Sequence, residues 1–188
     1  MLLNSNNTTL VLIDVQEKLE PAMHERETLV RNLTKLVQGM KSLQIPVFWL
    51  EQTPDKLGRT IPALRSLLEP ATPFTKNSFS CGGCTSFTQA LAASGRRQVL
   101  IAGIETHVCV YQTAVELIRD SYAVEVVADA VSSRRPLDHA IGLEKIRDCG
   151  RHSVGSGQGH MTTVETALFE LMRTAGHERF RDILKIVK

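Results

Sequence analysis

The chain has 188 residues, of which 22 are basic and 20 acidic, so its formal net charge is only +2. This length suffices for one domain with a sizeable core, and we expect residues 1–188 to form a single domain. The small charge and the scattered basic residues argue against nucleic acid as a partner. No apolar run approaches the roughly 20 residues that cross a bilayer, and no secretory signal is visible at the start. We therefore expect a cytoplasmic protein that does not bind membranes.

Apolar strand patterns alternate with helical patterns along the chain. Strands are predicted over residues 9–15, 45–50, 98–102 and 122–128. Helices are predicted over 27–43, 63–68, 85–94, 109–120, 135–149, 162–174 and 180–187, and the remainder of 51–79 is expected to be loop. Such alternation is typical of a parallel sheet covered by helices on both faces. The predicted fold class is α/β, a three-layer α/β/α Rossmann-like fold with a mainly parallel, six-stranded sheet.

Polar residues gather where the predicted strands end. In parallel α/β sheets, ligands bind at the carboxyl ends of the strands. This rule selects Asp14, Glu51 with Gln52, the segment 103–109, and Asp129. The sequence therefore predicts a functional site at this edge of the sheet.

Cys109 follows a strand and Gly103, and it stands at the start of a helical pattern. Unpaired N–H groups and the helix dipole favour a thiolate there, which is the reactive form of cysteine. A carboxylate such as Asp14 can accept the thiol proton, and an ammonium such as Lys76 can stabilise the charges. Each residue also has an ordinary structural interpretation: a strand-terminal Asp as a cap, a loop Lys as a solvated charge, and Cys109 as a small packing residue.

Four segments at compatible spacing carry a resemblance that covers nearly the whole chain. They are LVLIDVQEKL (10–19), FTKNSFS (74–80), GIETHVCVYQTA (103–114) and VVADAVSSR (126–134). Together they resemble the isochorismatase-like cysteine hydrolase superfamily. The segment LEQTPDKLGRTIPAL (50–64) is most similar to the isochorismatase-domain-containing branch, whose substrates are poorly defined.

The resemblance implies a role for each matching residue. Asp14 would be the general base, Lys76 the charge-stabilising member and Cys109 the nucleophile. A cis peptide would fall at Ile104–Glu105, and the N–H groups of Glu105 and Cys109 would form the oxyanion hole. The residues implied at the substrate pocket are Gln16, Glu51, Gln52 and Phe79.

Two departures narrow the expected chemistry. Nicotinamidases of this superfamily use an Asp-x-His pair and a further His for a metal, but no His lies between Met40 and Gly103 here. We therefore expect no metal and no cofactor. True isochorismatases lack the nucleophilic cysteine, so Cys109 argues against isochorismate as the substrate.

Three hypotheses follow. The leading one is a metal-independent cysteine hydrolase that cleaves a C–N bond of a small amide or carbamoyl compound through a thioester. The second is a catalytically silent, oligomeric interaction module with the same fold. The third is a redox protein that works through Cys81 and Cys84, whose CxxC spacing more simply indicates a glycine-rich turn before a helix. All four cysteines are expected to be reduced thiols, and the family usually forms homo-oligomers.

Overall fold

The structure, a computed structural model, describes residues 2–152 and 158–188 of the chain. Its centre is a six-stranded sheet in the order β3-β2-β1-β4-β5-β6, and every neighbouring pair is parallel. The strands are β1 (Thr8–Ile13), β2 (Val47–Gln52), β3 (Phe74–Lys76), β4 (Gln98–Ile104), β5 (Ala123–Ser132) and β6 (Gln158–Thr162). The predicted α/β/α architecture with six strands is confirmed.

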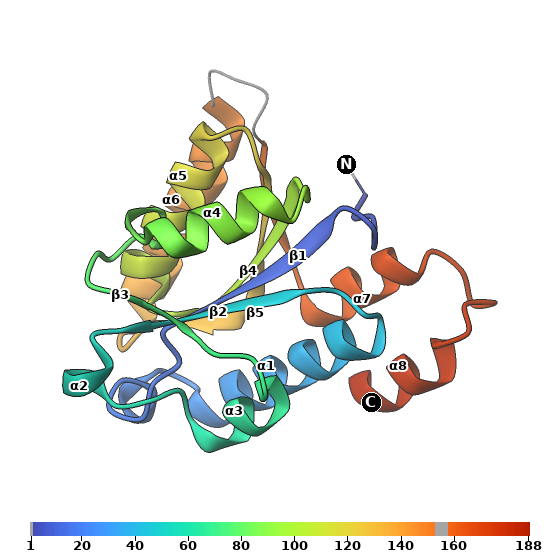
Figure 1. Cartoon of the computed structure of the whole chain (residues 1–188), viewed down its shortest axis with the longest axis horizontal. Helices are drawn as coiled ribbons and strands as arrows, with labels where there is room; N and C mark the ends of the chain where they lie inside the picture. Colours follow the sequence, from blue (N-terminus) through green and yellow to red (C-terminus); the bar gives the residue numbers. More distant parts are fainter. Residues whose placement is uncertain (1, 153–157) are drawn as a thin grey trace.

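Helices cover both faces of this sheet (Figure 1). One face carries α1 (Arg26–Ser42), α3 (Pro62–Leu68), α7 (Val164–Met172) and α8 (Phe180–Val187). The other carries α4 (Thr85–Ala93), α5 (Tyr111–Arg119) and α6 (Pro136–His152). Short pieces complete the chain: η1 (Glu20–Ala22), α2 (Pro54–Leu57), η2 (Cys81–Gly83) and η3 (Thr106–Val110). The two helical layers are separated by the sheet alone.

Side-chain alternation along the strands divides the core into two parts. In β1, Leu10 and Leu12 pack toward the α1 face, whereas Val11 and Ile13 pack toward the α4 face. All six residues of β1 are buried, as expected for a central parallel strand covered on both sides. The continuous apolar run in the sequence therefore reports the central position of this strand.

Two strands and one helix were absent from the sequence-based assignment. β3 has only three residues and lies in the stretch that was expected to be loop. β6 has the sequence QGHMT, which carries no apolar run, because an edge strand needs fewer buried side chains. The four-residue α2 lies in the same predicted loop.

Several element ends also differ from the prediction. β5 continues past Asp129 to Ser132, because Asp129 does not end the strand but accepts a hydrogen bond from the Val164 N–H through Oδ1 (2.9 Å). This contact fixes the first turn of α7. The helix that was expected to stop at Gly150 continues to His152. Local sequence signals therefore placed these elements well but not their ends.

Candidate active site

Asp14 follows β1 at the carboxyl edge of the sheet and is fully buried. Its backbone adopts φ 54°, a conformation that Asp tolerates better than most residues. Gly103 on β4 permits the close approach of the two central strands, because a Cβ there would lie 2.1 Å from the Ile13 carbonyl oxygen. A glycine at this position is therefore required for Asp14 and the end of β4 to come together.

The Lys76 side chain reaches Asp14 from the edge strand β3. Its Nζ donates to Asp14 Oδ2 at 2.6 Å, and both side chains are completely inaccessible to solvent. The same ammonium donates to Gln52 Oε1 (2.7 Å) and to the carbonyls of Ser78 (3.2 Å) and Phe79 (3.1 Å). Four oxygen acceptors thus surround the buried cation, which offsets much of the cost of removing it from water.

Cys109 lies in the helical turn η3 that directly precedes α5, so the helix begins at Thr106 rather than at the cysteine. This turn has π-helical geometry, and the Val110 N–H donates to the Glu105 carbonyl five residues earlier (3.2 Å). Local π-helical turns often occur at functional sites. Cys109 is 7% exposed, so only a small part of the residue can be reached from outside.

Asp14 and Cys109 are close enough to shift each other's titration. Burial raises the pKa of the Asp14 carboxyl, and the Lys76 ammonium opposes this rise. Burial also raises the pKa of the Cys109 thiol, and the Asp14 charge raises it further. Both effects favour the neutral thiol and oppose the thiolate that a helix start alone favours, because the sequence does not show how deeply the sulfur is buried. The Cys109 thiol thus lies beside a buried carboxyl group.

The peptide bond between Ile104 and Glu105 is cis. Among the described residues, no side chain accepts a hydrogen bond from the Glu105 N–H. The backbone hydrogen bonds outside the helices and strands do not involve this N–H either. The Glu105 carboxylate accepts hydrogen bonds from the backbone N–H (3.0 Å) and the Nε (3.1 Å) of Arg134. Arg134 thus ties the start of η3 to the segment after β5.

The four residues expected at a substrate pocket differ in their surroundings. Gln16 is buried, and its amide bridges the backbone of Gln52 and the carbonyl of Gly58. Glu51 is buried on the opposite face of β2 from Gln52, which contacts Lys76. Phe79 is 55% exposed next to the Lys76 loop. Gln52 and Phe79 adjoin Lys76, whereas Gln16 holds neighbouring loops together.

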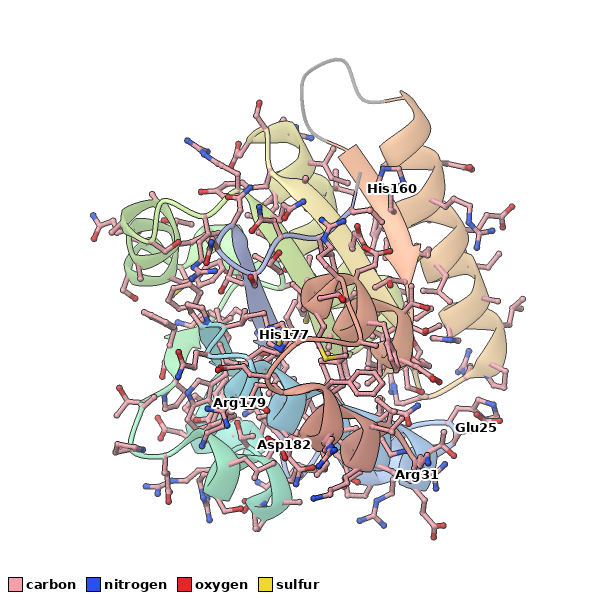
Figure 2. The ribbon with its side chains drawn as sticks, turned by 90° about the vertical axis from the view of Figure 1, so that its right-hand side faces the viewer. Glu25, Arg31, His160, His177, Arg179 and Asp182 are labelled. Carbon is pink, nitrogen blue, oxygen red and sulfur yellow. The ribbon has the colours of Figure 1, made fainter. Side chains whose placement is uncertain are left out.

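Among the described residues, the remaining cysteines and histidines do not form a second such cluster. Cys81 and Cys84 are free buried thiols around η2, and burial raises the pKa of Cys81 to about 12. Figure 2 shows His160 on β6 well apart from His177 near α8. Within residues 2–152 and 158–188, no group of three or more His, Cys, Asp or Glu side chains could hold a metal ion.

Sequence reasoning missed two hydrogen bonds that hold η3 in place. Thr106 Oγ1 and His139 Nδ1 lie 2.9 Å apart, and His107 Nδ1 lies 2.9 Å from Ser133 Oγ. The backbone of η3 also contacts α6 so closely that a Cβ at Gly142 would lie 2.9 Å from His107 Cα. Since these partners lie far from Cys109 in the sequence, no local signal could have revealed them.

The sheet and this buried Asp-Lys-Cys cluster define a parallel α/β/α protein with a candidate nucleophile at the carboxyl edge. The isochorismatase domain family matches residues 8–158, and the chain belongs to this family. Isochorismatase domain-containing protein 2 of Danio rerio is 33% identical over 185 residues, covering 98% of this chain and 89% of the relative. No helix among the described residues is long and apolar enough to span a membrane.

Solved structures are also similar to this chain. A Caenorhabditis elegans protein described as the MAR1 ribonuclease superposes with a TM-score of 0.89 at 30% identity, covering 100% of this chain and 92% of that one. The YcaC gene product of Escherichia coli, described as an octameric hydrolase of unknown specificity, gives a TM-score of 0.87 at 21% identity. That match covers 100% of this chain and 87% of the YcaC chain, and at this identity it supports the fold alone.

Proposed function

We propose that the protein is a metal-independent cysteine hydrolase that cleaves the C–N bond of a small amide or carbamoyl compound through a thioester. The observation that carries this proposal is the 2.6 Å contact between Lys76 Nζ and Asp14 Oδ2, inside a buried site that also contains Cys109. A buried charge pair next to a thiol is costly to maintain. It is useful where a proton must leave the sulfur during the reaction.

The two oxygens of the Asp14 carboxyl have different roles in this mechanism. Oδ2 accepts from Lys76, whereas the buried Oδ1 has no hydrogen-bond partner among the described residues. Oδ1 is therefore the acceptor for the Cys109 proton when the sulfur attacks the carbonyl carbon. The Lys76 ammonium keeps the carboxyl ionised until that step, because it lowers a pKa that burial raises.

The later steps use the same groups. The N–H groups of Glu105 and Cys109 stabilise the tetrahedral oxyanion. The protonated Asp14 then donates its proton to the leaving amine, which breaks the C–N bond and leaves the acyl group on Cys109. Water, deprotonated by Asp14, hydrolyses the thioester and restores the thiol. Gln52 and Phe79, together with Gln16 and Glu51, are proposed to border the bound substrate.

One observation favours the second hypothesis, the silent oligomeric module. The Cys109 thiol has little exposure and a raised pKa, which are features of an unreactive cysteine. The two hypotheses differ in what the buried pair does when a substrate arrives. The homo-oligomer itself is proposed for both, and it accords with the octamer described for the E. coli protein.

The deciding experiment is a panel of small amides and carbamoyl compounds screened for ammonia release. We expect turnover by the unmodified protein, a trapped acyl adduct at Cys109 by mass spectrometry, and loss of turnover in Cys109→Ala and Asp14→Asn. Cys149→Ala is the matched control, because Cys149 lies on α6 and belongs to a different element.

An RNA substrate belongs in the same panel, because the nematode relative is described as a ribonuclease. Turnover of RNA without any amide turnover would contradict the proposal. Near-normal amide turnover by Cys109→Ala would also contradict it, since the sulfur would then be dispensable.

A further inference from the structure

Gln16 follows Asp14 closely in the chain and is completely buried. Its side-chain amide holds both main-chain polar groups of Gln52, because Oε1 accepts from the Gln52 N–H (2.8 Å) and Nε2 donates to the Gln52 carbonyl (3.1 Å). Nε2 also donates to the Gly58 carbonyl (2.6 Å). An amide nitrogen carries two hydrogens, and both are used within the chain. The Gln16 side chain therefore fixes the end of β2 and has no donor left for a ligand.

The Gln52 side chain in turn holds the ammonium of Lys76. The two residues lie opposite each other in the register of β2 and β3, and Gln52 Oε1 accepts from Lys76 Nζ (2.7 Å). Two other acceptors of this ammonium are the carbonyls of Ser78 and Phe79, which follow Lys76 in its own loop and move with it. Gln52 Oε1 is therefore the acceptor that anchors the ammonium to the sheet independently of Asp14.

These contacts form a closed ring around the buried ion pair. The Gln16 N–H donates to the Asp14 carbonyl (2.8 Å), the Gln16 amide holds Gln52, Gln52 holds Lys76, and Lys76 pairs with Asp14. Gln52 Nε2 also donates to the Asn77 carbonyl (2.9 Å), which fixes the backbone directly after the lysine. The two members of the ion pair are thus held by a second path that does not run through the pair itself.

We propose that Gln16 and Gln52 are positioning residues that act in series, with Gln16 fixing Gln52 and Gln52 fixing the Lys76 ammonium against Asp14. This inference rests on the proposed function, in which Asp14 takes the Cys109 proton. The attraction between two charges falls with their distance, so a carboxylate that accepts and returns a proton needs its counter-ion at a fixed position. When Gln52 is lost or free to move, the ammonium is anchored only through its own loop and through Asp14, and its average distance from the carboxylate increases.

The Asp14 carboxyl supplies a measurement that needs no substrate. Its carbon-13 resonance, assigned by its loss in Asp14→Asn, is titrated with pH in the full chain and in Gln16→Met. Burial raises the pKa of this carboxyl, Lys76 lowers it, a hydrogen bond with Cys109 also lowers it, and the charge of Glu51 raises it. Because Gln16→Met weakens only the influence of Lys76, we expect the Asp14 titration to move to higher pH. The movement should have the same direction as in Lys76→Met and be smaller.

Gln98 provides the matched control, because it is also a buried glutamine whose amide accepts and donates hydrogen bonds within the chain. It lies at the start of β4, at the edge of the sheet opposite to Asp14. Gln16→Met and Gln98→Met should both lower stability in urea unfolding, since each removes buried hydrogen bonds. Only Gln16→Met should move the Asp14 titration and lower kcat/KM, about tenfold or more, on the compound found in the amide panel.

Gln52→Met tests the second link of the series. Gln52 is only partly buried, so this variant keeps the test open even where Gln16→Met does not fold. It should move the Asp14 titration in the same direction. Because Gln16 acts through Gln52, adding Gln16→Met to Gln52→Met should cause no further movement, whereas two independent residues would give additive changes.

Three results would each overturn the inference. They are an unchanged Asp14 titration in a folded Gln16→Met or Gln52→Met protein, an equal movement in Gln98→Met, and additive movements in the double variant. Each would show that the two amides only stabilise the loops. The proposed function fails by a different result, the absence of amide turnover in the unmodified protein, and the Asp14 titration is measured without any substrate.

Discussion

Asp14 and Glu125 are both buried carboxyl groups at strands of the sheet, but the charged groups next to them differ. Asp14 follows β1 at the carboxyl edge, whereas Glu125 lies near the start of β5. Burial raises the pKa of both, that of Glu125 to about 7. Asp14 has an ammonium at 2.6 Å that opposes this effect, but the neighbouring charge of Glu170 raises the pKa of Glu125 further.

The difference shows that burial alone does not indicate a functional carboxyl. In the proposed mechanism, Lys76 keeps Asp14 available as a base next to the Cys109 thiol, whose proton it takes. Glu125 has a more conspicuous pKa, yet no thiol is among the groups that shift it. Perturbed titration is a useful pointer only together with a partner and a reacting group.

Replacing Lys76 by Met makes Asp14 resemble Glu125 and should have the largest effect. The buried carboxyl loses its cation, its pKa rises, and it becomes protonated and unable to accept the thiol proton. We expect kcat/KM to fall by about 10³-fold or more, a loss of the size associated with general base catalysis. We also expect unfolding stability to fall by about 3 kcal/mol, because the buried carboxyl loses its ion-pair partner and must take up a proton to stay buried.

The measurement is kcat/KM on the compound found in the amide panel, with urea unfolding for stability. Lys145→Met is the control, because the exposed Lys145 places its Nζ 4.6 Å from the centre of the Tyr111 ring and not in the buried Asp14 site. Asp14→Asn combined with Lys76→Met should regain stability without regaining activity. A single Lys76→Met variant with unchanged turnover would mean that the cation is only structural.

The pH dependence of kcat/KM tests the effect of Lys76 on the Asp14 pKa, which is what distinguishes Asp14 from Glu125. The proposed mechanism requires ionised Asp14, so we expect kcat/KM to fall as the pH drops through the Asp14 pKa, which lies above the ordinary 3.8. Lys76→Met removes the influence that lowers this pKa, so the acidic limb should move to higher pH. The check is the kcat/KM profile of both proteins. A limb at the same position in both would show that another group titrates there.

The position of η3, which contains Cys109, should affect activity as well as the charges do, and a substitution at Gly142 tests this. A Cβ at Gly142 would lie 2.9 Å from the backbone of His107 and 3.0 Å from that of Thr106. Gly142→Ala should therefore displace η3 and lower kcat/KM about tenfold to hundredfold, since small misplacements of a reacting group are costly. Gly176→Ala is the matched control, because its nearest neighbour, Thr174 Oγ1, lies 3.6 Å away. Equal activity in both variants would show that η3 tolerates displacement.

Much of the fold and part of the site could be predicted from the sequence because their signals are local. The run TTLVLI predicts a central strand, and its last residue places Asp14 at the edge where parallel strands bind ligands. The same rule places the turn of Cys109 there. β3 was not predicted because three residues are too few to show a periodic pattern. β6 was not predicted because an edge strand contains few apolar residues.

Other features depend on contacts that the sequence does not contain. The protonation of Cys109 depends on how much protein covers the sulfur and on the nearby Asp14 charge. The Trp49 indole Nε1 is buried without a hydrogen-bond partner among the described residues, and no local sequence signal reports this.

Glu125→Gln should give the smallest effect and isolates the carboxyl that has no proposed role. The folded-state pKa of about 7 exceeds the ordinary 4.5, so the folded protein holds a proton that the unfolded chain releases. The stability contributed by this group is therefore complete below pH 4.5 and is lost as the pH rises through about 7. Above that pH the charged carboxylate destabilises the fold. Glutamine, which stays neutral, removes this penalty.

We expect Glu125→Gln to gain about 1 kcal/mol at about pH 8.5 and nothing at about pH 4.5, after a discount for partial solvent screening. Urea unfolding at both pH values measures the difference. Glu178→Gln is the control, because that side chain is 81% exposed and should give a small change at either pH. A gain that is the same at both pH values would mean that side-chain packing, and not the charge of Glu125, is responsible.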